Sequence, residues 1–498
     1  MNQIARTFVL VGLVVVILLA MHLLPTPKIG ETELRPVNIL SDVVAEPEQA
    51  ADIIDIPIVP GAPVATTGTP TIPTSPTQPQ TPTTPNVQQP TAPVTAGSPD
   101  SSLVSVGGGS GEPIVEQPAL SSDSVVMIAD YSAGAPGGMS HFYAQLGRVH
   151  SLGRPVRVAY YGDSFIEGDI LSGDVRELLQ NQFGGQGVGW VDCGSKVHGF
   201  RQTVVHNYSG FSEHEVVSRP FNGALQSISQ RYFLPTGSPR ITLSGTTRRK
   251  HVSQWQRSTF YLRSEGGCSL TARIQDADTT FNYQVAGSPI VQAIPCEIDT
   301  MPTKSITWSV GQTGRGTTLF GIALESLSGV IVDNFSMRGS AGFTIANIPM
   351  ETLRQFAAIR PYDLIIIQFG LNVANARQTN YRTYIDRMGQ AIDHLHQAFP
   401  TASILVISCP DRDQRTAQGI RTMNGVEQLI AYQQLMASEH HVAFLNLFQA
   451  MGGRESMKSL VERGLANKDY THLNFGGGRQ IAKPVVESIL AGYHAAGY

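Results

Sequence analysis

The stretch "VRVAYYGDSFIEGDILSGDVRELL", residues 156–179, sets the architecture of this 498-residue chain. An apolar, β-branched run ends at Gly162, Asp163 and Ser164 and passes directly into a pattern with helical spacing. A strand that leads straight into a helix is the repeating unit of an α/β domain. The serine at the junction has two interpretations: it caps a helix that begins near Phe165, or it is a nucleophile.

Four further apolar runs have the character of this first strand. They are "GVIVDNFS" (329–336), "DLIIIQFG" (363–370), "SILVISCP" (403–410) and "VAFLNLF" (442–448), and helical patterns lie between them. Continuous apolar runs are typical of a parallel sheet that helices cover on both faces. The sequence therefore predicts an α/β domain with a parallel sheet, beginning near residue 121.

A long interruption of different character separates the first two of these strands. Its runs are short and alternate apolar with polar residues, as in "PRITLSG", "STFYLRS", "LTARIQ", "FNYQVAG" and "SITWSV". Such spacing predicts an inserted antiparallel β-sandwich over residues 192–326. The α/β domain is thus expected in two parts, residues 121–191 and 327–498. Because strands of the parallel sheet lie on both sides of the insert, we expect that sheet to form without it.

The N-terminal part of the chain has no pattern of a globular fold. Residues 8–24 form an uncharged run of seventeen after the lone Arg6, which predicts a signal anchor, a transmembrane helix, over residues 1–24. A cleaved signal peptide is the alternative. Residues 25–120 are expected to be a disordered linker, since residues 60–99 contain eleven prolines and no charged residue. The remainder is expected to be extracytoplasmic and membrane-anchored, on the periplasmic face of the inner membrane in a Gram-negative cell.

Charge and cysteine content exclude some partners and cofactors. The net charge is −4 and only 15% of residues are charged, which argues against a nucleic-acid partner. The four cysteines show no spacing of metal ligands, so no metal site is predicted. Cys268 and Cys296 lie in one β-rich region, where they either pair or remain buried free thiols.

Four short blocks follow predicted strands or lie near the C-terminus. They are "GDS" (162–164), "DNFSMRGSAG" (333–342), "QFGLNVAN" (368–375) and "DYTHLNFGG" (469–477). Ligand sites of open α/β sheets lie at the carboxyl ends of strands. Each block alone fits a cap or a turn, but together they contain every part of a serine acyl-transfer site. Ser164 is the predicted nucleophile, His472 the base and Asp469 the residue that orients it. The N–H groups of Ser164 and Gly339 and the Asn372 amide are the predicted oxyanion hole.

These blocks resemble those of the SGNH (GDSL) hydrolases, in the same order: "GDSF", "NFSMRG", "GLN" and "DYTH". The distance from Ser164 to Gly339 is longer than in the minimal fold of that family, and the insert accounts for it. Bacterial peptidoglycan O-acetylesterases are similar in carrying an inserted domain like a carbohydrate-binding module. Phe165 departs from the histidine that often follows the serine in those enzymes. The resemblance implies a flavodoxin-like, three-layer fold that the insert interrupts. An α/β-hydrolase is excluded, because residues 162–166 lack its Gly-x-Ser-x-Gly elbow.

The resemblance implies a serine esterase that removes O-acetyl groups from a cell-envelope glycan, with peptidoglycan favoured. The reaction would pass through an acyl-enzyme and needs no cofactor. A glycan O-acetyltransferase on the same scaffold would use identical residues. A non-catalytic glycan-binding protein is a further alternative, although the complete set of four blocks argues against it.

Overall fold

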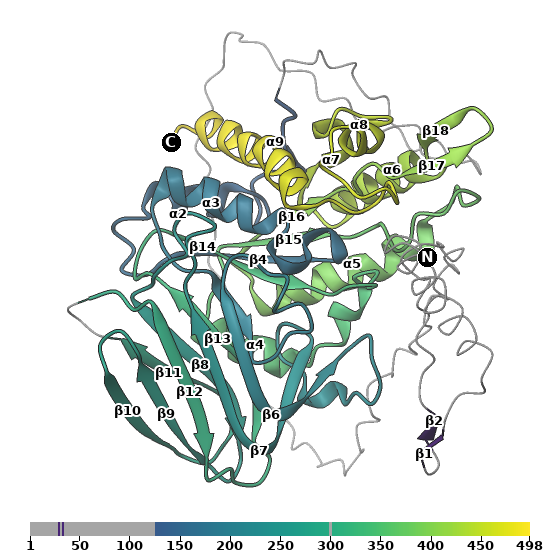
Figure 1. The fold of residues 1–498 in the computed structure, drawn as a ribbon. Coiled ribbons are helices and arrows are strands. Elements are labelled where there is room, and N and C mark those ends of the chain that lie inside the picture. The colour runs from purple at the N-terminus through teal and green to yellow at the C-terminus, as the bar shows by residue number, and fades with distance from the viewer. Residues whose placement is uncertain (1–27, 30–31, 34–124, 298–300) are drawn as a thin grey trace, which may run out of the picture. The chain divides into compact units, whose positions relative to one another are not determined.

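The computed structural model describes residues 28–29, 32–33, 125–297 and 301–498 (Figure 1). The chain divides into two units, residues 1–61 and 62–498. In the first unit, β1 (Lys28–Ile29) and β2 (Thr32–Glu33) form an antiparallel pair. The predicted anchor and nearly all of the predicted linker lie outside the described residues. No helix within the described part of the chain combines the length and the apolar character that a membrane crossing requires.

A six-stranded sheet forms the centre of the α/β domain. Its strands, in spatial order, are β14 (Val330–Ser336), β4 (Val156–Gly162), β15 (Leu364–Gln368), β16 (Ser403–Ile407), β19 (Ala443–Leu445) and β3 (Ala129–Asp130). The first five are parallel, and β3 pairs antiparallel with β19, so the sheet is mixed where a parallel sheet was predicted. The five parallel strands have the 2-1-3-4-5 order of flavodoxin-like folds, which places the switch point at β4.

Helices cover both faces of this sheet (Figure 1). They are α2 (Ser140–Gly147), α3 (Ser172–Phe183), α4 (Met350–Ile359), α5 (Arg382–Ala398), α6 (Val426–Glu439), α7 (Leu447–Ala450), α8 (Ser456–Glu462) and α9 (Phe475–Ala495). α3 packs against α9, and α5 packs against α4 and α6. Three short 3-10 turns are η1 (Ser164–Asp169), η2 (Gly223–Leu225) and η3 (Phe343–Asn347), and one hairpin joins β17 (Asp413–Thr416) to β18 (Gly419–Thr422).

Nine antiparallel strands form the described part of the insert. They are β5 (Gly189–Asp192), β6 (Val205–Glu215), β7 (Arg231–Ser244), β8 (Arg257–Ser264), β9 (Cys268–Ile274), β10 (Thr279–Val285), β11 (Ser288–Glu297), β12 (Ser305–Gly311) and β13 (Thr318–Glu325). β7 pairs with β6 and β12 and meets β13 only at Phe233, so it joins two sets of strands. Trp308 on β12 packs on Phe260 of β8 with ring centroids 5.4 Å apart, which places a core between the two sets.

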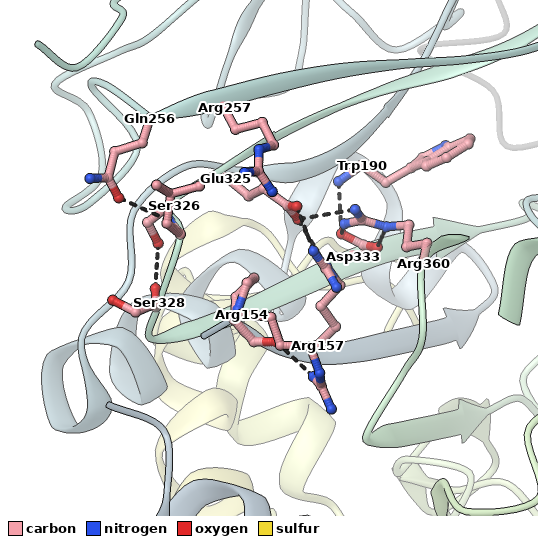
Figure 2. Close-up of polar contacts among 12 residues, drawn as sticks. Arg154, Arg157, Trp190, Gln256, Arg257, Glu325, Ser326, Ser328, Asp333 and Arg360 are labelled. Carbon is pink, nitrogen blue, oxygen red and sulfur yellow. Dashed lines mark hydrogen bonds and ion pairs between the residues drawn. The ribbon is translucent and has the colours of Figure 1, made fainter. Parts of the chain in front are cut away.

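The insert and the α/β domain share buried contacts. Figure 2 shows the Glu325 carboxylate, at the end of β13, between Arg157 on β4 and Arg360. Glu325 lies 2.7 Å from Arg157 and 3.0 Å from Arg360, and Arg360 also pairs with Asp333 at 2.8 Å. The backbone N–H of Trp190, on β5, donates to Asp333 at 2.8 Å. A charged network with almost no solvent access therefore links strands of both sheets.

The cysteines and tryptophans are all interior. Cys193, Cys268, Cys296 and Cys409 are buried free thiols, so Cys268 and Cys296 do not pair. The three tryptophans are each no more than 1% exposed. They serve the core and present no surface on which a sugar ring could stack.

Candidate active site

Ser164 stands two residues after the end of β4, at the switch point of the sheet. Its Oγ lies 2.9 Å from Nε2 of His472, 308 residues further along the chain. The helix-cap role falls to its neighbour: the Asp163 side chain accepts from the backbone N–H of Phe165 at 2.9 Å. The Ser164 hydroxyl is thus directed at the histidine, whereas Asp163 caps the turn.

A hydrogen bond at the other ring nitrogen, Nδ1, holds His472 in place. Nδ1 lies 2.8 Å from Oδ2 of Asp469, and Oδ1 of Asp469 accepts from the N–H groups of Thr471 and His472. Tyr470, at φ +57°, turns the chain between acid and base. Burial works to raise the pKa of Asp469, but its hydrogen bonds with His472 and the backbone outweigh burial and lower that pKa below its usual value. The carboxylate is ionised near neutral pH and favours the tautomer with a proton on Nδ1.

Gly339 and Asn372 stand at the ends of the two strands that flank β4. Gly339 follows β14 with φ +75°, a conformation that favours glycine, and a Cβ there would meet open space. The Asn372 amide follows β15 and donates to the Ser340 carbonyl at 3.0 Å and to Asp163 at 3.3 Å. The structure therefore brings the glycine loop, the asparagine and the serine to one edge of the sheet.

Asp163 connects two of these blocks, a role that the sequence did not reveal. Its carboxylate is 2% exposed and accepts from Phe165 on one side and from Asn372 on the other. Burial raises its pKa to about 6, and hydrogen bonds and the nearby His472 only partly oppose that rise. This acid therefore changes its charge in a pH range where most aspartates are fully ionised.

The insert reaches the surroundings of the site. Phe200, in the loop after β5, is 49% exposed, and its ring centroid lies 4.9 Å from that of Phe475, three residues after His472. A Cβ on Gly168, in the turn that begins at Ser164, would lie 2.7 Å from the Phe200 ring. Sequence reasoning missed this residue, since a single phenylalanine in a loop carries no signal of its spatial neighbours.

The model of the GDSL-like Lipase/Acylhydrolase family matches residues 305–477. This chain carries a GDSL-like acylhydrolase domain. The match begins at β12 of the insert and contains Gly339, Asn372, Asp469 and His472, whereas Ser164 precedes it. This domain is of the SGNH esterase type, as the four blocks predicted.

A solved structure resembles this esterase over most of its described length. "Peptidoglycan O-acetylesterase in action, 5 min" aligns with a TM-score of 0.57 and 20% identity, covering 74% of this chain and 99% of that one. A family two carbohydrate esterase from Cellvibrio japonicus covers 58% of this chain and 99% of its own, with 9% identity and a TM-score of 0.23. The first likeness shows a common fold. Comparison with curated protein sequences finds no match.

Proposed function

We propose that this esterase removes O-acetyl groups from a cell-envelope glycan, with peptidoglycan as the favoured substrate. The hydrogen-bonded chain from Ser164 Oγ through His472 to Asp469, with distances of 2.9 and 2.8 Å, carries the proposal. The distances from nucleophile to base and from base to orienting acid are already within the hydrogen-bonding range that such catalysis needs. The solved peptidoglycan O-acetylesterase, whose fold spans both the hydrolase and the insert, supports the choice of glycan.

The reaction runs in two halves. Ser164 Oγ attacks the acetyl carbonyl while His472 Nε2 takes its proton, and His472 then returns that proton to the departing sugar hydroxyl. Water, activated by the same histidine, then attacks the acetyl-serine ester and releases acetate. Asp469 keeps the imidazole oriented through both halves.

The oxyanion hole needs one exchange of hydrogen bonds. The backbone N–H groups of Ser164 and Gly339 are the proposed fixed donors. Asn372 would contribute by exchanging its longer contact, 3.3 Å to Asp163, for the oxyanion, while its 3.0 Å bond to Ser340 keeps the amide in place. This exchange is favoured once negative charge develops on the substrate.

Replacing Ser164 with alanine tests the proposal. Because Asp163 caps the turn, Ser164→Ala should leave the melting temperature within about 1 °C and lower acetate release by several orders of magnitude. The substrates are acetylated peptidoglycan, acetylated xylan and p-nitrophenyl acetate. An added oligosaccharide acceptor separates hydrolysis from transfer, since a transferase would acetylate it. A folded variant with wild-type acetate release would overturn the proposed nucleophile.

We also propose that the enzyme works outside the cytoplasm, anchored by its N-terminal segment. The uncharged run of residues 8–24 and the proline-rich stretch that follows support this arrangement. A reporter fused after residue 99 should be active only outside the cytoplasm. Reporter activity in the cytoplasm would contradict both the location and the tether.

A further inference from the structure

A cavity of about 410 Å³ lies between the insert and the turn that begins at Ser164. The hydrolase contributes Glu167 and Gly168 from that turn and Ser336 from β14. Ser336 pairs in register with Gly162, two residues before Ser164. The cavity is therefore on the insert side of the nucleophile and has the size of a small-molecule subsite.

Strands of the insert supply most of the charge in this cavity. Asp192 comes from β5, Glu213 and Glu215 come from β6, and Arg231 comes from β7. Arg231 pairs with Asp192 at 3.2 Å and with Glu215 at 3.5 Å, and the Lys196 ammonium also pairs with Glu215. Two cations thus face three carboxylates in this wall.

Two further arginines line the cavity and pair with carboxylates of the η1 turn. Arg338 pairs with Glu167 at 2.6 Å, and Arg201 pairs with Asp169 at 2.7 Å. Asp169 also pairs with the buried Arg176 at 3.1 Å, so three arginines face two carboxylates here, but none of the three forms an ion pair with a carboxylate of the insert wall.

Glu213 is the carboxylate without a partner. It is half-buried on the same face of β6 as Glu215, and it forms no ion pair or side-chain hydrogen bond with any described residue. Its cross-strand neighbour is Phe233, which offers no charge. Burial raises the pKa of Glu213 above its usual value, and Arg231 only partly opposes this. An unpaired carboxylate in such a place costs free energy that a cationic ligand group would recover.

We propose that this cavity is a substrate subsite in which Glu213 binds a primary ammonium group of the glycan. The inference rests on the proposed function and narrows it to amine-bearing glycans. Peptidoglycan fits this class, since its peptide stems and any free amino sugar carry such groups, whereas xylan has none. The insert then selects the substrate by building one wall of the active-site region.

Binding of peptidoglycan fragments without O-acetyl groups tests this subsite separately from catalysis. Calorimetry would compare fragments with free amines against the same fragments after N-acetylation. The wild-type Kd should be about tenfold lower for the free amines, as expected for a charge-assisted hydrogen bond. In Glu213→Gln the two Kd values should become equal. Glu265→Gln is the matched control, because Glu265 lies on the insert outside the cavity and pairs with the exposed Arg315.

Two results would overturn the subsite. One is equal wild-type affinity for free and blocked amines, a comparison that needs no variant. The other is a folded Glu213→Gln protein that still prefers the free amines. Absence of acetate release from every acetylated substrate, with amine-dependent binding intact, would instead contradict the proposed esterase reaction and leave the subsite standing.

Discussion

The Asn372 side chain makes two hydrogen bonds of unequal length from one amide nitrogen. The 3.3 Å contact to Asp163 is the weaker, so this N–H is the one available to an oxyanion. Asn372→Ala keeps nucleophile and base and should lower kcat by about 10²–10³. Because the residue is exposed, the melting temperature should change little. Steady-state kinetics on an acetyl ester check this, and an unchanged kcat would remove Asn372 from the oxyanion hole.

Asp163 makes stability depend on pH in an unusual direction. Its pKa is about 6 in the folded protein against an ordinary value of 3.8. The folded state therefore holds this proton more tightly than the unfolded state, and this contribution to stability is lost as pH rises from about 4 to 6. The free energy of unfolding that is lost over this pH range is about 3 kcal/mol.

Replacing Asp163 with asparagine should remove that dependence. The free energy of unfolding of Asp163→Asn, measured in urea, should improve relative to wild type by up to about 3 kcal/mol between pH 4 and 6. Asp278→Asn is the control, since Asp278 is exposed beside Arg273 and should show no such trend. A constant difference between wild type and Asp163→Asn across this range would contradict the raised pKa.

The residues of the four blocks were accessible from sequence because each block follows a strong strand pattern or stands in a distinctive motif. Parallel strands end at one edge of a sheet, so Ser164, Gly339 and Asn372 were expected together. The contact between Asp163 and Asn372 joins residues 209 positions apart and depends on exact side-chain placement. The contact between Phe200 and Phe475 likewise joins residues far apart in the sequence and depends on exact side-chain placement. No local pattern encodes such contacts.

At the scale of elements, the segment after Ser164 differs from the helix expected to begin near Phe165. A 3-10 turn ends at Asp169, and α3 begins only at Ser172. Asp169, at φ +67°, is buried against Arg176 and Arg201, which holds the kink in place. Sequence reasoning also omitted β6, because its mixture of His, Ser and Glu shows no clean alternation. Tertiary ion pairs and partial burial overrode local pattern in both cases.

The Asp169 ion pairs should be essential to the turn that carries Ser164. Asp169→Asn would leave the fully buried Arg176 without its counter-charge and should cost about 3–5 kcal/mol. Acetyl-ester hydrolysis should fall with it, since the same turn begins at the nucleophile. Asp386→Asn, at an exposed pair with Arg382, should change stability by less than about 0.5 kcal/mol. Equal, small effects of both substitutions in urea denaturation would show that the buried pairs do not hold the turn.

At the scale of the whole described domain, the insert is part of the hydrolase core. Trp190 and Tyr261 of the insert share one hydrophobic cluster with Phe335 and Phe356 of the α/β domain. The sequence-based expectation that the parallel sheet forms without the insert takes no account of this shared core. Replacing residues 199–325 with a short Gly/Ser linker should therefore abolish cooperative thermal unfolding. A soluble variant that melts cooperatively would restore the modular interpretation.

Glu325, on the insert, forms ion pairs with two arginines of the α/β domain, Arg157 and Arg360. Burial works to raise its pKa, but Arg360 and Arg157 outweigh burial and hold that pKa at about 2. A depressed folded-state pKa stabilises the protein fully above about 4.5, and this stability is lost as pH falls toward 2. Glu325→Gln should cost about 3–5 kcal/mol near neutral pH, because it leaves buried guanidinium groups short of a counter-charge.

The pH profile separates this charge effect from a simple loss of packing. The gap in unfolding free energy between wild type and Glu325→Gln should narrow by about 3 kcal/mol as pH falls from 4.5 to 2. Glu297→Gln is the matched control, since Glu297 also pairs with an arginine on this sheet but is 35% exposed, as is its partner Arg257. Its cost should stay below about 1 kcal/mol at every pH. A gap for Glu325→Gln that does not change with pH would mean that shape, and not charge, joins the insert to the hydrolase.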